Sequence, residues 1–294
     1  MRGTLIAGSE IDEPRSAIGS LTGEAADLLL HAHSDDDGSL VLAGKSGEFT
    51  VDPFDLDAVA EFLDGLLRPI TLDITSMDHR TWVPLMMALA NCGDEVRMSY
   101  ARPDDYLRDS EARILRDSWP LSKGFGEVGS LPGLLNTSDL EMPGARFVGL
   151  LGFEGARLER IMLSEGIRND MLIPVIPSPG FRVEYPSYTA LSNSRVLELS
   201  KVSDRIYFAS ASCPFDTYFV LQDLNKKFSA TLLAIAPVGT KPHAVGAVLW
   251  AMRNPASTKV IYDYPTRSEH RTRGVTTYCV YHLGAFLRDY PIPC

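Results

Sequence analysis

Cysteine is scarce in this chain: its 294 residues include four, Cys92, Cys213, Cys279 and Cys294. Their spacing matches no zinc pattern, so we expect buried or free thiols in a reducing cytosol. No run of about 18 apolar residues is present, which argues against a transmembrane helix. The first residues contain a short apolar piece broken by charges, unlike a secretory signal. We therefore expect a cytoplasmic protein without membrane contact.

Basic residues are also in the minority, with 28 Lys and Arg against 38 Asp and Glu and a formal net charge of −10. This balance argues against a dedicated nucleic-acid-binding protein. Several signatures of catalysis are missing, namely the phosphate loop GxxxxGK[ST], the serine elbow GxSxG and the zinc motif HExxH. The acidic run at residues 35–37 lacks the spaced ligands of a calcium loop. We predict neither a metal nor a cofactor.

Strand-like apolar runs alternate with helical patterns along most of the chain. Residues 1–23 show little periodicity and are predicted to be a flexible N-terminus. Residues 24–52 are predicted to form an N-terminal β-hairpin element. In residues 53–294 the alternation predicts an α/β domain, a doubly wound, mainly parallel Rossmann-like sheet of about seven strands. Residues 103–145 form a long insertion into it, either a lid over the carboxyl edge of the sheet or a surface excursion.

Residues 230–265 carry the clearest strand–turn–helix–strand pattern of the chain. An apolar run ends in Gly239-Thr240-Lys241, and a helical stripe and a second strand follow. Gly239 permits a close backbone approach, and Thr240 is a good N-cap. The helix dipole disfavours a cation such as Lys241 in the first turn unless an anion is bound there. We predict a phosphate-type anion site at this turn; the alternative is a capped helix with an exposed lysine.

Ligands of doubly wound sheets bind outside the carboxyl ends of the strands. Polar residues that follow the predicted strands are therefore the candidate ligand-binding residues. They are Asp73, Thr75, Ser76, Glu154, Gly239, Thr240, Lys241, Asp263, Arg267 and Arg271. The two arginines add positive charge beyond the last strand of the Gly-Thr-Lys unit. The predicted ligand is a nucleotide or another anionic small molecule.

Three side chains near this edge have alternative roles. Glu154 lies between glycines at a predicted helix start, where it suits a ribose hydroxyl, a metal or a favourable interaction with the helix dipole. His243 is either a general acid or base or a structural histidine. Cys213 precedes a predicted helix, where the pKa of a thiol falls, so it is either a nucleophile or a buried structural thiol.

The segment from Gly239 through Lys241 and the strand at Lys259 to Tyr264 resemble the CARF family, the Rossmann-like sensor domains of CRISPR-associated proteins. The turn at Asp73 to Ser76 resembles the other nucleotide-contacting loop of that family. The resemblance implies a homodimer that binds cyclic or linear oligoadenylates across the dimer axis, and some members cleave them. This chain departs from the family in its extra strands and its long insertion. More loosely, it resembles uncharacterised Rossmann-like proteins found with bacterial antiviral defence genes.

Three functions remain open at this point. The first is a nucleotide-sensing or accessory subunit of an antiviral defence system, with a protein partner in a defence complex. The second is a nucleotide hydrolase or nuclease that combines Lys241 with Glu154, Asp263 or His243. The third is a protein-interaction subunit whose core is only a scaffold. We favour the sensor, because an anion site needs no catalytic group, and leave open whether the protein is an enzyme.

Overall fold

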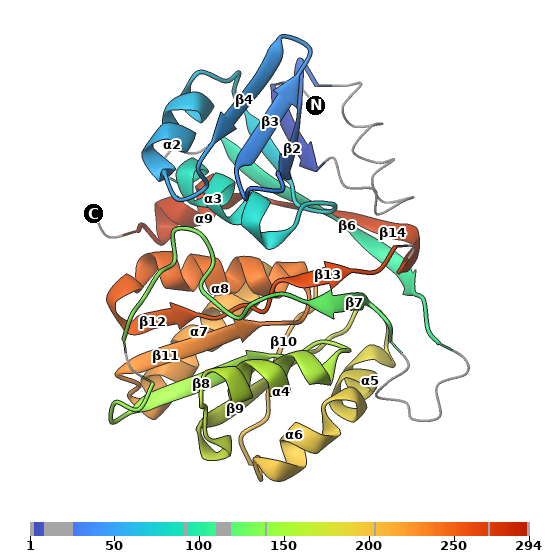
Figure 1. The fold of residues 1–294 in the computed structure, drawn as a ribbon, viewed down its shortest axis with the longest axis vertical. Coiled ribbons are helices and arrows are strands. Elements are labelled where there is room, and N and C mark those ends of the chain that lie inside the picture. Colours follow the sequence, from blue (N-terminus) through green and yellow to red (C-terminus); the bar gives the residue numbers. More distant parts are fainter. Residues whose placement is uncertain are drawn as a thin grey trace. The chain divides into compact units, whose positions relative to one another are not determined.

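The structure is a computed structural model that describes residues 3–8, 26–90, 93, 95–109, 119–138, 140–202, 204–269 and 271–292. The chain divides into two compact units (Figure 1). Unit 1 combines Met1–Tyr106 with Glu269–Cys294, and unit 2 is Leu107–Ser268. Each unit is built on a sheet of its own.

A seven-stranded sheet forms unit 1, in the order β14-β6-β5-β1-β2-β3-β4. Its strands are β1 (Thr4–Gly8), β2 (Leu28–Ser34), β3 (Leu40–Gly44), β4 (Gly47–Val51), β5 (Ile70–Asp73), β6 (Val96–Tyr106) and β14 (Thr272–Tyr281). β1 pairs in parallel with β2 and β5, and β5 pairs in parallel with β6. The other three neighbouring pairs are antiparallel. The central strands β1 and β5 are almost entirely buried, as expected for short apolar runs inside a sheet.

The helices of unit 1 are α2 (Leu56–Asp64), α3 (His79–Leu89) and α9 (Leu283–Asp289). Aspartate side chains cap the first two. Asp55 accepts a hydrogen bond from the backbone N–H of Ala58 at 3.0 Å, and Asp78 accepts one from Thr81 at 2.7 Å. These contacts satisfy N–H groups that have no partner inside the helix. α3 buries Trp82 completely, so it forms part of the core of this unit.

A five-stranded parallel sheet forms unit 2. Its strands are β8 (Ala145–Leu150), β9 (Leu172–Pro177), β10 (Tyr207–Ala209), β11 (Leu232–Pro237) and β12 (Thr258–Val260). They are arranged β10-β9-β8-β11-β12, which is 3-2-1-4-5 when the strands are numbered along the chain. The direction of strand addition reverses between β8 and β11, and ligands bind parallel sheets near such a reversal.

Helices cover both faces of this sheet. They are α4 (Gly155–Ser164), α5 (Tyr185–Ser192), α6 (Ser194–Leu199), α7 (Pro214–Phe228) and α8 (Lys241–Arg253), with short 3-10 turns η3 (Asn169–Met171) and η4 (Pro255–Ser257). Right-handed crossovers place α4 to α6 on one face and α7 and α8 on the other. In Figure 1, α4 lies in front of the sheet and α7 behind it. All six residues of β9 and of β11 are therefore buried.

A small antiparallel sheet joins two distant segments of unit 2. β7 (Ser122–Phe125) pairs with β13 (Pro265–Arg267), and an isolated bridge joins Gly129 to Tyr262. β7 belongs to the predicted insertion, whereas β13 follows the last strand of the parallel sheet. These pairings hold residues 122–129 next to the residues that follow β12.

The predicted α/β class with a large, mainly parallel sheet is confirmed. The strands are distributed over two sheets, however, whereas a single sheet over residues 53–294 was expected. The prediction of a flexible N-terminus over residues 1–23 is wrong at Thr4–Gly8, which form the central strand β1. This strand was missed because only five residues lie between Gly3 and its end, too few to show a period. Residues 9–25 lie outside the described residues.

β2, β3 and β4, which were expected as a separate hairpin element at residues 24–52, pair within the sheet of unit 1. The predicted insertion at residues 103–145 begins inside β6 and supplies β7. None of the helices in the described parts of the chain has the length and apolar character needed to cross a membrane.

Candidate functional site

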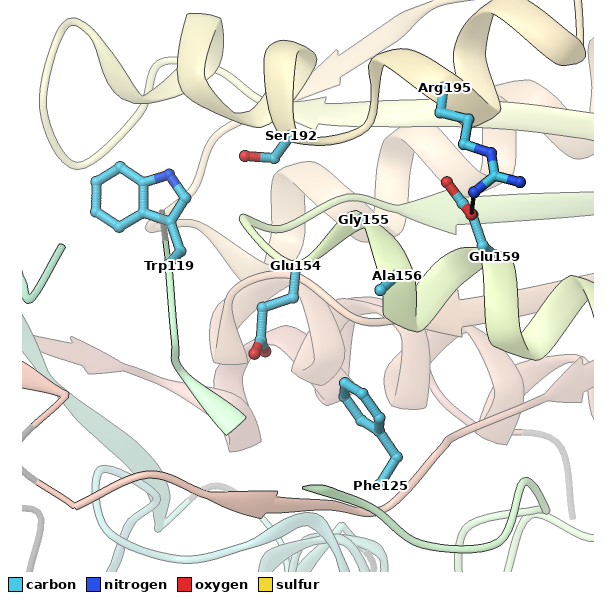
Figure 2. Close-up of a pocket in the computed structure, with 8 residues that line it drawn as sticks. All are labelled: Trp119, Phe125, Glu154, Gly155, Ala156, Glu159, Ser192 and Arg195. Atoms are coloured by element: carbon cyan, nitrogen blue, oxygen red, sulfur yellow. Dashed lines mark ion pairs between the residues drawn. The ribbon is translucent and has the colours of Figure 1, made fainter. Parts of the chain in front are cut away.

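A cavity in unit 2 lies at the N-terminus of α4, just after the carboxyl end of β8. Its volume is about 230 Å³. Eight residues line it: Trp119, Phe125, Glu154, Gly155, Ala156, Glu159, Ser192 and Arg195 (Figure 2). Glu154 is the N-cap residue of α4, and its side chain makes no capping bond to the described backbone. Gly155 and Ala156, the first two residues of α4, also line the cavity.

Glu154 is the ionisable group at the centre of this site. Its Oε2 atom accepts a hydrogen bond from the hydroxyl of Ser122 at 2.9 Å and lies 4.0 Å from Nη1 of Arg157. Burial raises the pKa of Glu154, while Arg157 and Ser122 act in the opposite direction. In Figure 2 the carboxylate points into the cavity from the loop that precedes α4. Such a group can accept hydrogen bonds from a ligand or exchange a proton with it.

Two aromatic side chains from the predicted insertion enclose the cavity. Trp119 stacks on Phe153, with ring centroids 4.5 Å apart and an interplanar angle of 24°. Phe125 ends β7, and the guanidinium of Arg160 lies over its ring at 5.6 Å. Arg160 also donates a hydrogen bond to the carbonyl of Gly126 at 2.5 Å. The insertion thus lies against the carboxyl end of β8, where it leaves a partly enclosed space.

Two buried polar atoms of the lining lack a hydrogen-bond partner among the described residues: Nε1 of Trp119 and Oγ of Ser192. Each of these residues is 5% exposed. Figure 2 shows the Ser192 hydroxyl pointing from α5 in the direction of the Trp119 indole. A buried polar group without a partner costs about 1–3 kcal/mol, and native proteins keep few of them. Both atoms thus belong to residues of the lining and keep a hydrogen-bonding capacity that the described protein does not use.

The remaining charged residues of the lining pair with each other. Nη1 of Arg195 lies 3.4 Å from Oε2 of Glu159, and the two side chains are 60% and 32% exposed. The pair is marked by the dashed line in Figure 2. An exposed pair of this kind stabilises the fold little, but it occupies the one arginine of the lining.

A buried ion pair lies beside the cavity. Nη2 of Arg157 donates to Oδ1 of Asp263 at 2.6 Å, and Nε donates to Oδ2 at 3.0 Å. A further bond runs from Nη1 to the carbonyl of Val238 at 3.3 Å, and the centroid of the Tyr262 ring lies 5.3 Å from the guanidinium carbon. Although burial opposes the charge, Tyr262, Asp263 and Glu154 keep the pKa of Arg157 above its ordinary value. Asp263, a predicted ligand residue, is thus bonded to the protein and is fully buried.

The Gly-Thr-Lys turn is held by protein contacts. A Cβ atom on Gly239 would lie 2.3 Å from the carbonyl oxygen of Leu151, so this glycine is needed for the close approach of two loops. The Thr240 hydroxyl donates to Ala211 at 3.0 Å and accepts from the backbone N–H of His243 as the N-cap of α8. Lys241 is buried, so the alternative prediction of a capped helix with an exposed lysine is wrong on the exposure of this side chain. This turn does not line the cavity.

His243 and Cys213 were the other catalytic candidates. Nε2 of His243 lies 3.2 Å from the carbonyl of Ala209 and 3.1 Å from that of Ser210, which fixes the proton on Nε2. Burial lowers the pKa of His243 to about 4, so the ring is neutral. Cys213 is the N-cap residue of α7, is partly exposed and forms no disulfide. These contacts give His243 a structural role.

The turn from Asp73 to Ser76 lies in unit 1, at the carboxyl end of β5, and is a buried hydrogen-bond network. Oδ1 of Asp73 accepts bonds from the backbone N–H and the hydroxyl of Thr75, at 2.9 and 2.5 Å. The Thr75 hydroxyl oxygen accepts from the N–H of Ala101 at 2.8 Å. The Ser76 hydroxyl donates to the carbonyl of Gly8 at 3.3 Å. These hydrogen bonds between protein groups fix the conformation of the turn.

The ten predicted residues are thus divided between the units: Asp73, Thr75, Ser76 and Arg271 belong to unit 1, and the others to unit 2. In unit 2 the structure brings Glu154 and Asp263 to the same arginine. Arg267 ends β13 opposite Ser122. In the part of the chain that the structure describes, no three His, Cys, Asp or Glu side chains are placed to hold a metal ion.

Sequence reasoning missed most residues of the site, among them Trp119, Phe125, Arg157 and Ser192. Arg157 had a local signal, since it follows Glu154 by three residues on a predicted helix and such pairs face each other. For Trp119 and Phe125 the only signal in the sequence was their position in the predicted insertion. Nothing in the local sequence of Ser192 indicates a site. Comparison with protein-family models, curated proteins and solved structures gave no match to this chain.

Proposed function

We propose that unit 2 is a Rossmann-like ligand-binding domain. We further propose that the protein is a nucleotide-sensing or accessory subunit of a bacterial antiviral defence system. The observation that supports this most directly is the cavity at the N-terminus of α4, which Trp119 and Phe125 of the insertion enclose. An insertion that lies over the carboxyl end of a strand favours a small-molecule site over a partner surface.

The strand order supports the same proposal. Sheets of order 3-2-1-4-5 bind nucleotides where the order reverses, outside the carboxyl ends of the strands. The reversal in unit 2 lies between β8 and β11, and the cavity begins directly after β8. A glutamate at this point suits a ribose hydroxyl or an N–H group of a ligand. We therefore place the ligand beside Glu154 rather than at Lys241.

A hydrolase acting in the same cavity is the second candidate. Burial raises the pKa of Glu154, which is the change that makes a carboxylic acid an effective proton donor near neutral pH. Ser122 holds the carboxyl group in one orientation. In this candidate Glu154 donates its proton to the leaving group as that bond breaks, a water molecule forms the new bond to the rest of the nucleotide, and the proton that the water releases restores Glu154.

The test is a thermal-shift screen of the full chain against mono-, di- and cyclic nucleotides, with every hit followed by mass spectrometry. A ligand at about 100 times its Kd is expected to raise the melting temperature by about 5–10 °C. Glu154→Gln keeps the size of the side chain and is expected to lose most of this shift. Lys241→Met keeps the buried stem and is expected to retain it.

The results separate the candidates. A shift without turnover identifies a sensor, and a shift followed by product identifies an enzyme. A rise in melting temperature that requires Lys241 but not Glu154 would place the ligand at the Gly-Thr-Lys turn. If no nucleotide stabilises the folded wild-type protein, the nucleotide proposal fails.

A further inference from the structure

We propose that the cavity binds the base end of the ligand, an uncharged planar nitrogen heterocycle, and that any phosphate groups lie outside it. This inference rests on the proposed function and adds the chemical class that the cavity recognises. It is carried by three properties of the lining residues: their charge, their unpartnered hydrogen-bonding atoms and their aromatic surfaces.

The charges of the lining oppose a phosphate inside the cavity. The lining contains two carboxylates, Glu154 and Glu159, and one cation, Arg195. Arg195 is paired with Glu159 at 3.4 Å. Arg157, whose Nη1 atom is 4.0 Å from Glu154, directs three of its hydrogen bonds to Asp263 and another to a backbone carbonyl. A phosphate placed beside Glu154 would therefore meet a like charge, and the one cation among the eight lining residues is already paired.

The hydrogen-bonding atoms suit the edge of a nucleobase. Glu154 offers carboxyl oxygens, of which Oε2 holds one bond, from Ser122. Ser192 and Trp119 offer an O–H and an N–H that have no partner in the described structure. Base edges present N–H donors next to ring-nitrogen or carbonyl acceptors. A base can therefore donate to Glu154 and accept from Ser192 or Trp119 at the same time, whereas a phosphate offers acceptors alone.

The aromatic residues supply flat apolar walls. Figure 2 shows Trp119 and Phe125 entering the space around Glu154 from two sides. All nucleobases can stack on aromatic side chains, because each has a flat π-face. Aromatic walls therefore favour a planar ligand over a compact anion. Trp119 is held in place by its stack on Phe153, which means that this wall exists before the ligand arrives.

The experiment is a titration calorimetry series on the full chain with nucleosides, ribose 5-phosphate and inorganic phosphate. At least one nucleoside is expected to bind within about tenfold of the affinity of its nucleotide, and the two phosphate compounds are expected not to bind. The hit is then compared with its derivative methylated at the ring nitrogen of the base-pairing edge. Blocking that nitrogen is expected to weaken binding at least about tenfold, because a buried polar atom of the protein then stays unpaired.

Ser192→Ala is the decisive variant, because the Ser192 hydroxyl has no hydrogen-bond partner among the described residues to lose. The variant is expected to unfold at the same denaturant concentration as wild type or higher, and to bind the nucleoside about tenfold or more weakly. Ser164→Ala is the matched control, since Ser164 is exposed at the far end of α4. It is expected to change neither quantity.

Three outcomes overturn the inference. Nucleotides or ribose 5-phosphate that bind while every nucleoside fails would place the phosphate in the cavity and leave the proposed function standing. Unchanged nucleoside binding by Ser192→Ala would place the base elsewhere. If neither nucleosides nor nucleotides bind, the inference and the proposed function fail together.

Discussion

Arg157 of α4 and Asp263, which follows β12, form a buried ion pair with Nη2 and Oδ1 2.6 Å apart. The pair joins the helix after β8, the middle strand of the five-stranded sheet, to the chain leaving the edge strand β12. Since Arg157 is also 4.0 Å from Glu154, the pair fixes a positive charge beside the cavity. Its first role is to hold the loops at the carboxyl edge together.

Breaking this pair should destabilise the protein strongly. Arg157→Met or Asp263→Asn leaves a buried charged or polar group without its partner, which costs about 3–5 kcal/mol. The free energy of unfolding, measured by urea denaturation, is expected to fall by that amount in each variant. The double variant Arg157→Met with Asp263→Leu should be more stable than either single variant, because neither charge of the pair is then left buried without the other.

The control for this prediction is the exposed pair Arg168–Asp170, whose Nε and Oδ1 atoms are 3.0 Å apart. Both side chains are more than half exposed, so Arg168→Met should leave the unfolding midpoint unchanged. A double variant at Arg157 and Asp263 that is less stable than both single variants would contradict the importance of the charge pairing itself.

Gly239 should not tolerate a side chain, because a Cβ atom there would lie 2.3 Å from the carbonyl oxygen of Leu151. Gly239→Ala is expected to reduce the free energy of unfolding by about 1–3 kcal/mol through overpacking. Gly124→Ala is the matched control, since a Cβ atom on Gly124 meets nothing within 4 Å. Equal stability of the two variants in the same denaturation assay would show that the glycine of the Gly-Thr-Lys turn is not required for packing.

The strand–turn–helix order around Gly239 was predictable from the sequence, because β11, α8 and their turn form one local pattern of apolar runs and capping residues. The same holds for β8 and α4. What the turn does was not predictable, since the carbonyl that Gly239 approaches belongs to Leu151, almost 90 residues earlier. Local patterns report an element and its caps, but not the element against which it packs.

The site itself was only partly predictable for the same reason. Glu154 was found because it follows a strand and begins a helix. Ser192 and Trp119 come from segments far from it in the sequence, and only the folded chain brings them to one cavity. The division into two sheets was equally hidden, because strand–helix alternation looks the same whether consecutive strands join one sheet or two. The short strand β1 carries too little pattern to be recognised.

His243 should make stability depend on pH. Its pKa is lowered to about 4 in the folded protein by burial, from an ordinary value of 6.5. As the pH falls below 6.5, His243 takes up a proton in the unfolded chain. In the folded protein it is not protonated until the pH reaches about 4. The stabilisation is therefore present above pH 6.5 and is lost on acidification, by about 3 kcal/mol over this range.

The measurement is the free energy of unfolding of wild type and of His243→Gln at pH 7 and pH 4. Glutamine can still donate a hydrogen bond to the carbonyl oxygens of Ala209 and Ser210. Acid-sensitive carboxyl groups affect both proteins equally, so wild type should lose about 3 kcal/mol more than the variant between the two pH values. Equal losses of stability in the two proteins would mean that folding does not lower the pKa of His243.

Trp119 should report occupation of the cavity by its fluorescence. Its indole lines the cavity, whereas Trp82 belongs to unit 1 and Trp250 is outside the lining. A bound base is expected to change the emission of the wild-type protein and to leave that of Trp119→Phe unchanged, because the remaining tryptophans do not touch the ligand. Since phenylalanine preserves stacking on Phe153 but cannot donate a hydrogen bond, calorimetry on this variant should show binding weakened about tenfold. A ligand-induced change that persists in Trp119→Phe would place the ligand away from this cavity.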